Sequence, residues 1–411
     1  MTPFLQLALA LAIIILAAKL AGYLSLRFGQ PTVLGELLVG ILLGPALLDL
    51  LHLTIFTDRH LGEVVHELAE IGVLLLMFIA GLGLHISDLA RSGKVAALGG
   101  VLGVVAPLSL GSALGWSFGM DWRAAFFIGL TLSATSVSIS AQTLIELNRL
   151  RSRVGIGLLG AAVFDDILVV LGLSLFIALG AAEAGAGWLQ VLSIVGQMLL
   201  FLMLASALGR WVLPILIKKF NDLPISQGLM AFTFITILLF GWMAEVIGNM
   251  AAITGAFLAG LWLARTPLRD RIAGVVAVPA YGIFVPIFFV DVGLTADVRA
   301  LTGESIWLLL AMILIAVLSK VIGAGGGARL AGFTWREALQ FGVGMMSRGE
   351  VGLIVASIGV AEGILDQGAF AAVVGVVVVT TLLTPPLLRA LFTGAGVLKE
   401  AEVESAEGGT L

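Results

Sequence analysis

Two adjacent aspartates, Asp165 and Asp166, lie near the middle of an apolar run that is long enough to cross a lipid bilayer. A carboxylate in hydrocarbon costs at least about 2.5–3.5 kcal/mol on insertion scales. Two neighbouring carboxylates cost more, because each opposes the ionisation of the other. Such a pair persists only where it has partners, and it usually marks a path for ions or protons.

The composition is that of a polytopic membrane protein. The 411 residues are 60% hydrophobic and 12% charged, whereas a soluble domain carries roughly 25% charged residues. There is no cysteine, which excludes disulfides, thiolate metal sites and cysteine nucleophiles. Residues 394–411 form an acidic tail that we expect to be short, disordered and cytoplasmic. Four histidines lie near predicted helix ends and are expected at the surface: His52, His60, His66 and His85.

About 20 apolar residues span a bilayer, and on this criterion the sequence predicts thirteen transmembrane helices. We expect the first to be a transmembrane helix and not a signal peptide, because Lys19 follows the apolar run and no basic region precedes it. The predicted segments are 4–26, 31–51, 64–85, 94–119, 123–147, 153–181, 188–217, 226–247, 250–265, 273–293, 303–331, 336–362 and 368–393.

The distribution of Lys and Arg predicts how these helices are oriented. Loops after odd-numbered segments hold fifteen of these residues, and loops after even-numbered segments hold only Arg59, Arg123 and Arg299. By the positive-inside rule, the N-terminus lies outside and the C-terminus is cytoplasmic.

Thirteen helices divide into two inverted groups of six around a linker helix, an organisation typical of secondary transporters. The fifth helix of each group carries a candidate break, rich in hydroxyls at 132–140 and in glycine at 342–352. Two such breaks would cross near the midplane and offer carbonyls and hydroxyls to a cation. Alternatively, the hydroxyls only bond to helical carbonyls or pack between helices.

Charged residues inside the helices are the candidate functional groups. Asp165 and Asp166 lie about 100° apart on a helix, so one can pair with a cation of the protein while the other faces an ion cavity. The buried Lys320 is the expected partner, in a pair that is either switchable or a static salt bridge.

Four further charged residues carry weaker hypotheses. Arg348 and Glu350 lie in the second break, where they either neutralise helix ends and each other or contact the cavity. Glu245 and Asp291 lie near helix ends, at the interface or at an ion entrance.

Together these motifs resemble the monovalent cation:proton antiporters, specifically the NapA-type sodium/proton antiporters of bacteria. The resemblance runs from residue 4 to about 393, and its motifs are 30–45, 134–137, 160–166, 255–260, Lys320 with the glycines after it, and 348–354. It implies a homodimer in a bacterial inner membrane that exchanges Na+ or Li+ for H+ and has a role in pH homeostasis. It also implies that the protein has no enzymatic activity, no cofactor and no nucleic-acid partner.

The resemblance also implies a domain organisation with elevator-type alternating access. A dimerisation domain comprises 1–93 and 223–300, a core ion-transport domain comprises 94–187 and 301–393, and residues 188–222 form the linker helix. Asp166 would be the principal ion ligand, aided by Thr135 and Ser136, while Asp165 would pair with Lys320. A paired acid and lysine are associated with electrogenic exchange of two protons for one Na+.

Two residues depart from the family pattern. Ser138 stands where glycine is usual, and Asp291 stands where an apolar residue is expected.

Potassium/proton antiporters of the Kef type share the fold, but we expect no nucleotide-binding regulatory domain in this chain. A sodium-coupled symporter is disfavoured by the adjacent acids and the buried lysine, and an aspartyl protease by having both acids on one helix. A passive channel is excluded mainly by the resemblance.

Overall fold

The computed structural model describes residues 1–45, 47–84, 92–180, 187–222, 226–294 and 304–393, and all regular structure in these ranges is helical. The elements are α1 (Pro3–Arg27), α2 (Thr32–Leu43), η1 (Leu50–His52), α3 (Leu61–Leu82), α5 (Gly93–Ser117), α6 (Trp122–Ser133), α7 (Val137–Glu146), α8 (Arg153–Gly180), α9 (Gly187–Ala207), η2 (Leu208–Val212), α10 (Leu213–Asp222), α11 (Gly228–Val246), α12 (Ala252–Leu263), α13 (Arg269–Pro279), η3 (Ala280–Phe284), α14 (Val285–Leu294), α15 (Glu304–Leu330), α16 (Trp335–Gly344), α17 (Glu350–Ala361) and α18 (Gln367–Thr393).

The prediction of an all-helical membrane protein is confirmed. Ten helices in the described residues are long and apolar enough to cross a membrane, and three further apolar helices are shorter. The number of thirteen crossings stays a prediction. His85 and the tail 394–411 lie outside the described residues.

Several helices differ from their predicted lengths for local reasons. The segment expected at 31–51 ends as a helix at Leu43, because Pro45 holds the preceding Gly44 in an extended conformation with ψ −177°. The predicted helices 188–217 and 273–293 each contain a five-residue π-helical turn, η2 and η3.

Local sequence also explains how helices begin. The hydroxyl of Thr2 accepts from the backbone N–H of Leu5 at the start of α1, and the carboxylate of Asp121 caps α6. Thr334 and Glu337 form a reciprocal capping box at the start of α16. Each cap satisfies backbone donors that a helix leaves free in its first turn.

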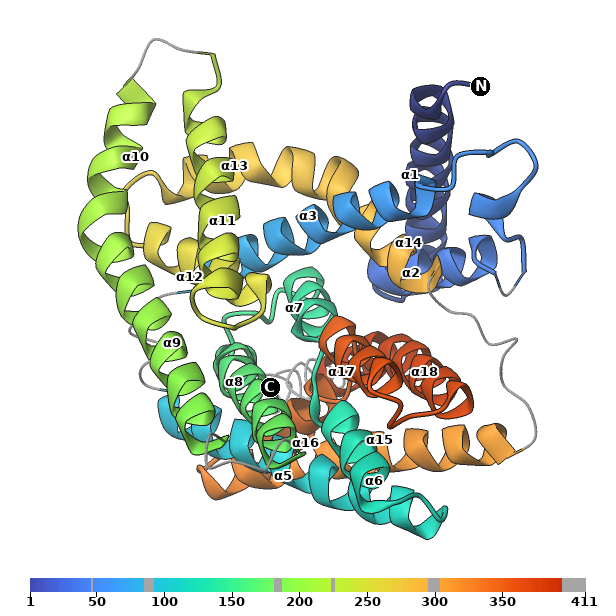
Figure 1. Cartoon of the computed structure of the whole chain (residues 1–411). Helices are drawn as coiled ribbons and strands as arrows, with labels where there is room; N and C mark the ends of the chain where they lie inside the picture. The colour runs from blue at the N-terminus through green and yellow to red at the C-terminus, as the bar shows by residue number, and fades with distance from the viewer. Residues whose placement is uncertain (46, 85–91, 181–186, 223–225, 295–303, 394–411) are drawn as a thin grey trace, which may run out of the picture.

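The helices form two packed groups (Figure 1). In the lower part of the figure α5 packs against α6, α8 and α15, and α15 packs against α16 and α18. In the upper part α3 packs against α12 and α14, α14 against α2, and α2 against α1. We call these the α5–α15 group and the α3–α14 group.

Glycine permits the close contact between α3 and α12. A Cβ atom on Gly81 would collide with the carbonyl oxygen of Phe257, and one on Gly260 would collide with that of Phe78. Small residues at such crossings let two helix backbones approach and gain van der Waals contact, which is the main driving force for packing in lipid.

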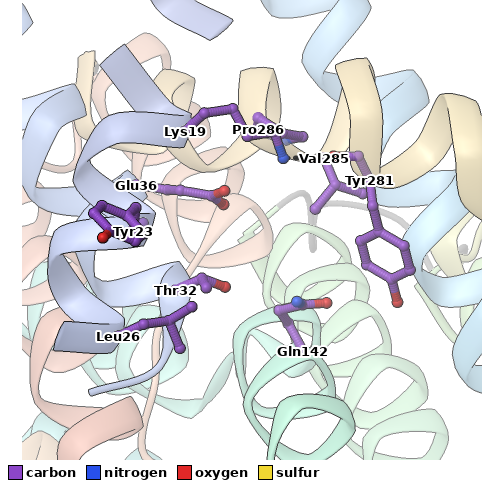
Figure 2. A pocket seen from close by; sticks show the side chains of 10 residues that line it. Lys19, Tyr23, Leu26, Thr32, Glu36, Gln142, Tyr281, Val285 and Pro286 are labelled. Atoms are coloured by element: carbon purple, nitrogen blue, oxygen red, sulfur yellow. Dashed lines mark hydrogen bonds between the residues drawn. The ribbon is translucent and has the colours of Figure 1, made fainter. Parts of the chain in front are cut away.

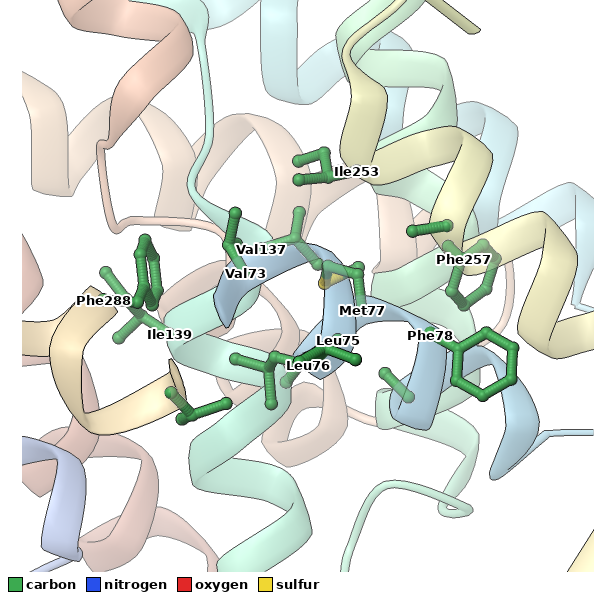
Figure 3. Packing of buried hydrophobic residues seen from close by; sticks show 14 of the residues in the cluster. Val73, Leu75, Leu76, Met77, Phe78, Val137, Ile139, Ile253, Phe257 and Phe288 are labelled. Carbon is green, nitrogen blue, oxygen red and sulfur yellow. The ribbon is translucent and has the colours of Figure 1, made fainter. Parts of the chain in front are cut away.

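Where the two groups meet near α7, the contact is apolar (Figure 3). Val137 and Ile139 of α7 lie beside Val73 of α3 and Phe288 of α14, and all four belong to one buried cluster. Polar contacts also cross near α7, since the backbone N–H of Thr32 on α2 donates to the Glu146 carboxylate at the end of α7 at 2.7 Å.

Candidate functional site

Two interrupted helices cross at the centre of the molecule. α6 and α7 are separated by Ala134–Ser136, and α16 and α17 by residues 345–349, both within the segments where breaks were predicted. The backbone N–H of Ser136 donates to the carbonyl of Ser347 at 2.9 Å, and the Ser347 hydroxyl donates to the carbonyl of Ser136 at 2.6 Å. These bonds satisfy backbone groups that the interruptions release, as burial at membrane depth requires.

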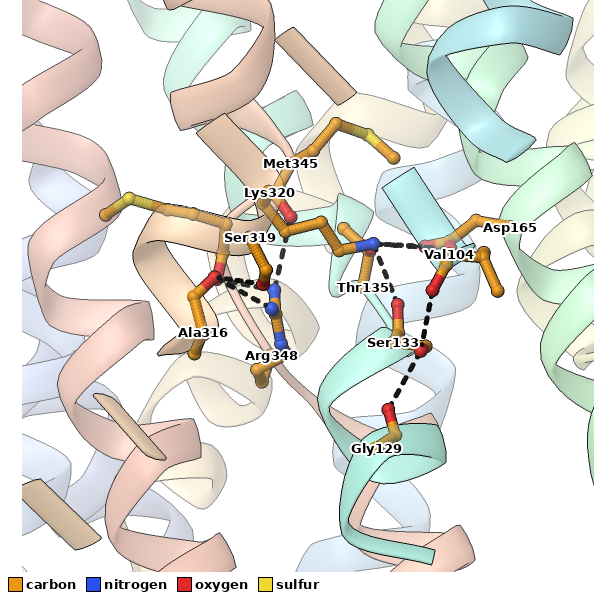
Figure 4. A network of polar contacts seen from close by, with 11 residues as sticks. Val104, Gly129, Ser133, Thr135, Asp165, Ala316, Ser319, Lys320, Met345 and Arg348 are labelled. Carbon is orange, nitrogen blue, oxygen red and sulfur yellow. Dashed lines mark hydrogen bonds and ion pairs between the residues drawn. The ribbon is translucent and has the colours of Figure 1, made fainter. Parts of the chain in front are cut away.

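Lys320 of α15 lies at the end of α6 (Figure 4). Its ammonium is fully buried and donates to the carbonyl of Ser133 at 2.7 Å and to the hydroxyl of Thr135 at 2.6 Å. It also lies 3.3 and 3.4 Å from the two carboxylate oxygens of Asp165. The ammonium therefore neutralises both a buried acid and the negative end of a helix dipole.

Arg348 takes the corresponding position at the end of α16. The fully buried guanidinium donates to the carbonyls of Met345 at 3.3 Å, Met346 at 2.8 Å and Ala316 at 3.0 Å. The geometry favours the interpretation that Arg348 neutralises exposed helix carbonyls. The side chain of Glu350 lies outside the described residues.

Asp166 is oriented differently from Asp165, although both are on α8. It is 7% exposed, and its Oδ2 accepts a hydrogen bond from the hydroxyl of Thr254 at 3.0 Å. Thr254 belongs to α12, so this bond joins the α5–α15 group to the α3–α14 group. Sequence reasoning missed Thr254; its only signal was a hydroxyl directly before the glycine of an apolar motif.

The serine hydroxyls in and after the first break bond within the crossover. Ser136 and Ser138 have their hydroxyl oxygens 3.1 Å apart, and both side chains are buried. Ser140 donates to the carbonyl of Gly344. The crossover thus presents carboxylate, hydroxyl and carbonyl oxygens, the donors that suit hard cations.

Comparisons with known proteins agree with this arrangement. A family model described as "Sodium/hydrogen exchanger, transmembrane" matches residues 13–394. The chain belongs to the sodium/hydrogen exchanger family.

Individual relatives cover nearly the whole chain. It is 39% identical to the Na+/H+-K+ antiporter GerN of Bacillus cereus over 93% of this chain and 95% of the relative. It is 35% identical to a Na+/H+ antiporter of Enterococcus hirae over 92% of this chain and 96% of the relative. The fold resembles that of the antiporter MjNhaP1 of Methanocaldococcus jannaschii with a TM-score of 0.68, at 17% identity, covering 96% and 99% of the two chains.

The remaining predicted residues of this exchanger chain lie away from the crossover. Asp291 of α14 is 7% exposed, and its Oδ2 lies 2.8 Å from Nδ1 of His66 on α3. It is therefore buried and paired within the α3–α14 group. The His66 side chain remains 57% exposed, as expected for a surface histidine. Glu245 is exposed near the end of α11.

Proposed function

We propose that this chain exchanges Na+ or Li+ for H+ across the membrane, as a NapA-type antiporter. The observation that carries the proposal is the separation of two adjacent buried acids. Asp165 faces Lys320, whereas Asp166 faces Thr254 across the contact between helix groups. In this proposal Lys320 neutralises Asp165, and Asp166 binds the transported ion.

Na+ and protons compete for the site in this mechanism. Na+ binds the carboxylate of Asp166, with help from Thr135, Ser136 and carbonyls freed by the breaks. Binding draws Asp165 away from Lys320, whose ammonium then releases its proton. In the reverse step Asp166 and Lys320 take up protons, and Na+ leaves. An empty, charged site is disfavoured during movement because the membrane does not solvate it.

The movement proposed is of the elevator type. The α5–α15 group is the moving core, the α3–α14 group is the dimerisation domain of a homodimer, and α9–α10 is the linker. The apolar contact of Val73 and Phe288 with α7 supports this assignment, because such a surface permits sliding. The hydrogen bonds from Thr254 to Asp166 and from Thr32 to Glu146 must then break in each cycle.

Exchange of two protons for one Na+ would be electrogenic. Each net charge moved is worth about 2.3 kcal/mol per 100 mV, so the membrane potential would drive Na+ export. We place the protein in a bacterial inner membrane, with its N-terminus outside, its C-terminus cytoplasmic and a role in pH homeostasis.

K+/H+ exchange by the same site is the second candidate. It is favoured by the name of the GerN relative, which includes K+, and by 30% identity to a K+/H+ antiporter subunit of Bacillus subtilis over 80% of this chain and 80% of that relative.

Reconstitution would test both candidates. The purified protein is reconstituted into liposomes that have an acidic interior and an internal pH dye. Na+, Li+ or K+ is then added in turn. In the Na+ and Li+ experiments, K+ and valinomycin clamp the membrane potential. Dequenching by Na+ and Li+ that changes with the clamped potential is the expected result. A response to K+ alone would select the second candidate, and no response to any cation would reject the antiporter proposal.

A further inference from the structure

A cavity of about 310 Å³ lies between α1, α2, the η3–α14 segment and α7 (Figure 2). Its polar lining residues come from both helix groups: Lys19, Tyr23, Thr32 and Glu36, with Tyr281, from the α3–α14 group, and Gln142 from α7. None of these residues takes part in the crossover described above.

Glu36 is the unusual member of this cavity. Its side chain is 6% exposed, and its carboxylate points into the space between the helices (Figure 2). It packs against Gly22 of α1, where a Cβ atom would lie 3.7 Å from Oε1 of Glu36. A buried carboxylate is costly unless it is protonated or has a cation beside it.

The neighbouring side chains supply one cation, Lys19, and a second carboxylate, Glu146. The Lys19 ammonium donates to the carbonyl of Tyr281 at 2.6 Å. Glu146, at the end of α7, is a second carboxylate; it accepts from the N–H of Thr32 at 2.7 Å and from Nε2 of Gln142 at 2.9 Å. When both carboxylates are ionised, Lys19 compensates only one of their two negative charges.

The other polar atoms that line the cavity can also accept hydrogen bonds. Oε1 of Gln142 and the hydroxyl of Tyr281 are buried and have no hydrogen-bond partner among the described residues. Gln142 itself is only 6% exposed. Carboxylate, amide and hydroxyl oxygens are hard donors that suit alkali cations.

We propose that this cavity is a second cation site, where a partly hydrated Na+ binds against Glu36 before it reaches Asp166. A water occupies about 30 Å³ in the liquid, so the volume accommodates an ion together with several waters. The helix α7 links the two sites: Gln142 lies about 9 Å from Ser136 at 1.5 Å per residue. The identity of the ion rests on the proposed function.

Equilibrium binding of radioactive Na+ to the purified full chain tests this proposal. Wild type, Asp166→Asn, Glu36→Gln and the Asp166→Asn/Glu36→Gln double variant are titrated at alkaline pH, after size-exclusion chromatography confirms that each is folded. We expect two ions per protomer for wild type, one for each single variant and none for the double variant. Glu70→Gln is the matched control, because the Glu70 side chain is 68% exposed on α3, and it should bind as wild type.

Two results would overturn the proposal. If Asp166→Asn alone removes all Na+ binding, or if Glu36→Gln binds as wild type, the cavity holds no ion and Glu36 carries only a proton. Should Glu36→Gln fail to fold, Gln142→Met in the Asp166→Asn background replaces it, and an unchanged affinity there rejects the site. Failure of the proposed function is distinct, since wild type would then show no cation-driven exchange in liposomes.

Discussion

Replacing Lys320 by methionine tests the pairing at the crossover most directly. The substitution removes an ammonium that is fully buried and that contacts Asp165, Thr135 and the carbonyl of Ser133 within 3.4 Å. Removing one partner of a buried ion pair destabilises a protein by about 3–5 kcal/mol, because the other charge remains buried and uncompensated. We expect Lys320→Met to lower the free energy of unfolding by an amount in that range.

The pairing makes a second, more specific prediction. Exchanging both members of a buried ion pair for uncharged groups is often neutral, so Asp165→Asn in the Lys320→Met background should restore most of the lost stability. The assay is reversible unfolding in mixed detergent micelles, analysed as a double-mutant cycle. Lys94→Met is the control, because Lys94 is exposed at the start of α5. A double variant no more stable than Lys320→Met would refute the reasoning.

Three further predictions concern the ion site. Asp166→Asn should abolish cation-driven dequenching in liposomes while the protein stays folded; retained exchange would remove it as the ion ligand. Thr254→Val deletes the hydroxyl that donates to Asp166 and so competes with the cation. Hydrogen bonds to charged groups are worth about 1.5–3 kcal/mol, so the apparent KM for Na+ should fall about tenfold or more. An unchanged KM would show that this hydrogen bond does not compete with Na+. Gly349→Ala would place a Cβ 2.6 Å from the side chain of Ser136, at a cost of about 1–3 kcal/mol. This variant should have a lower melting temperature and a lower exchange rate. Gly326→Ala is the control and should change neither quantity, because its Cβ would meet nothing within 4 Å.

Much of the fold could be predicted because its signals are local. Helices in lipid require long apolar stretches whose backbone groups bond within the segment, and these stretches are visible in the residues themselves. Both interruptions fell in segments marked by hydroxyls or by glycine. Lys320 could be paired with an aspartate because the interior of the bundle holds few other buried cations.

Other features could not be read in this way. Glu36 is the fifth residue of α2, and nothing in the neighbouring sequence indicates that its carboxylate points into a cavity. The position of Asp291 at an interface or an entrance stays a prediction, and its contact with His66, 225 residues away in the sequence, could not be predicted.

The sequence by itself determined the helical membrane fold, the approximate positions of the breaks and the presence of two acids and a lysine in the interior, since each depends on neighbouring residues in the chain. Only the tertiary structure decided that Asp166 meets Thr254, 88 residues away, and that Glu36 and Gln142 line one cavity. Such contacts depend on which helices pack together, and at crossings such as that of Gly81 and Gly260 this is decided by the fit of one surface against another.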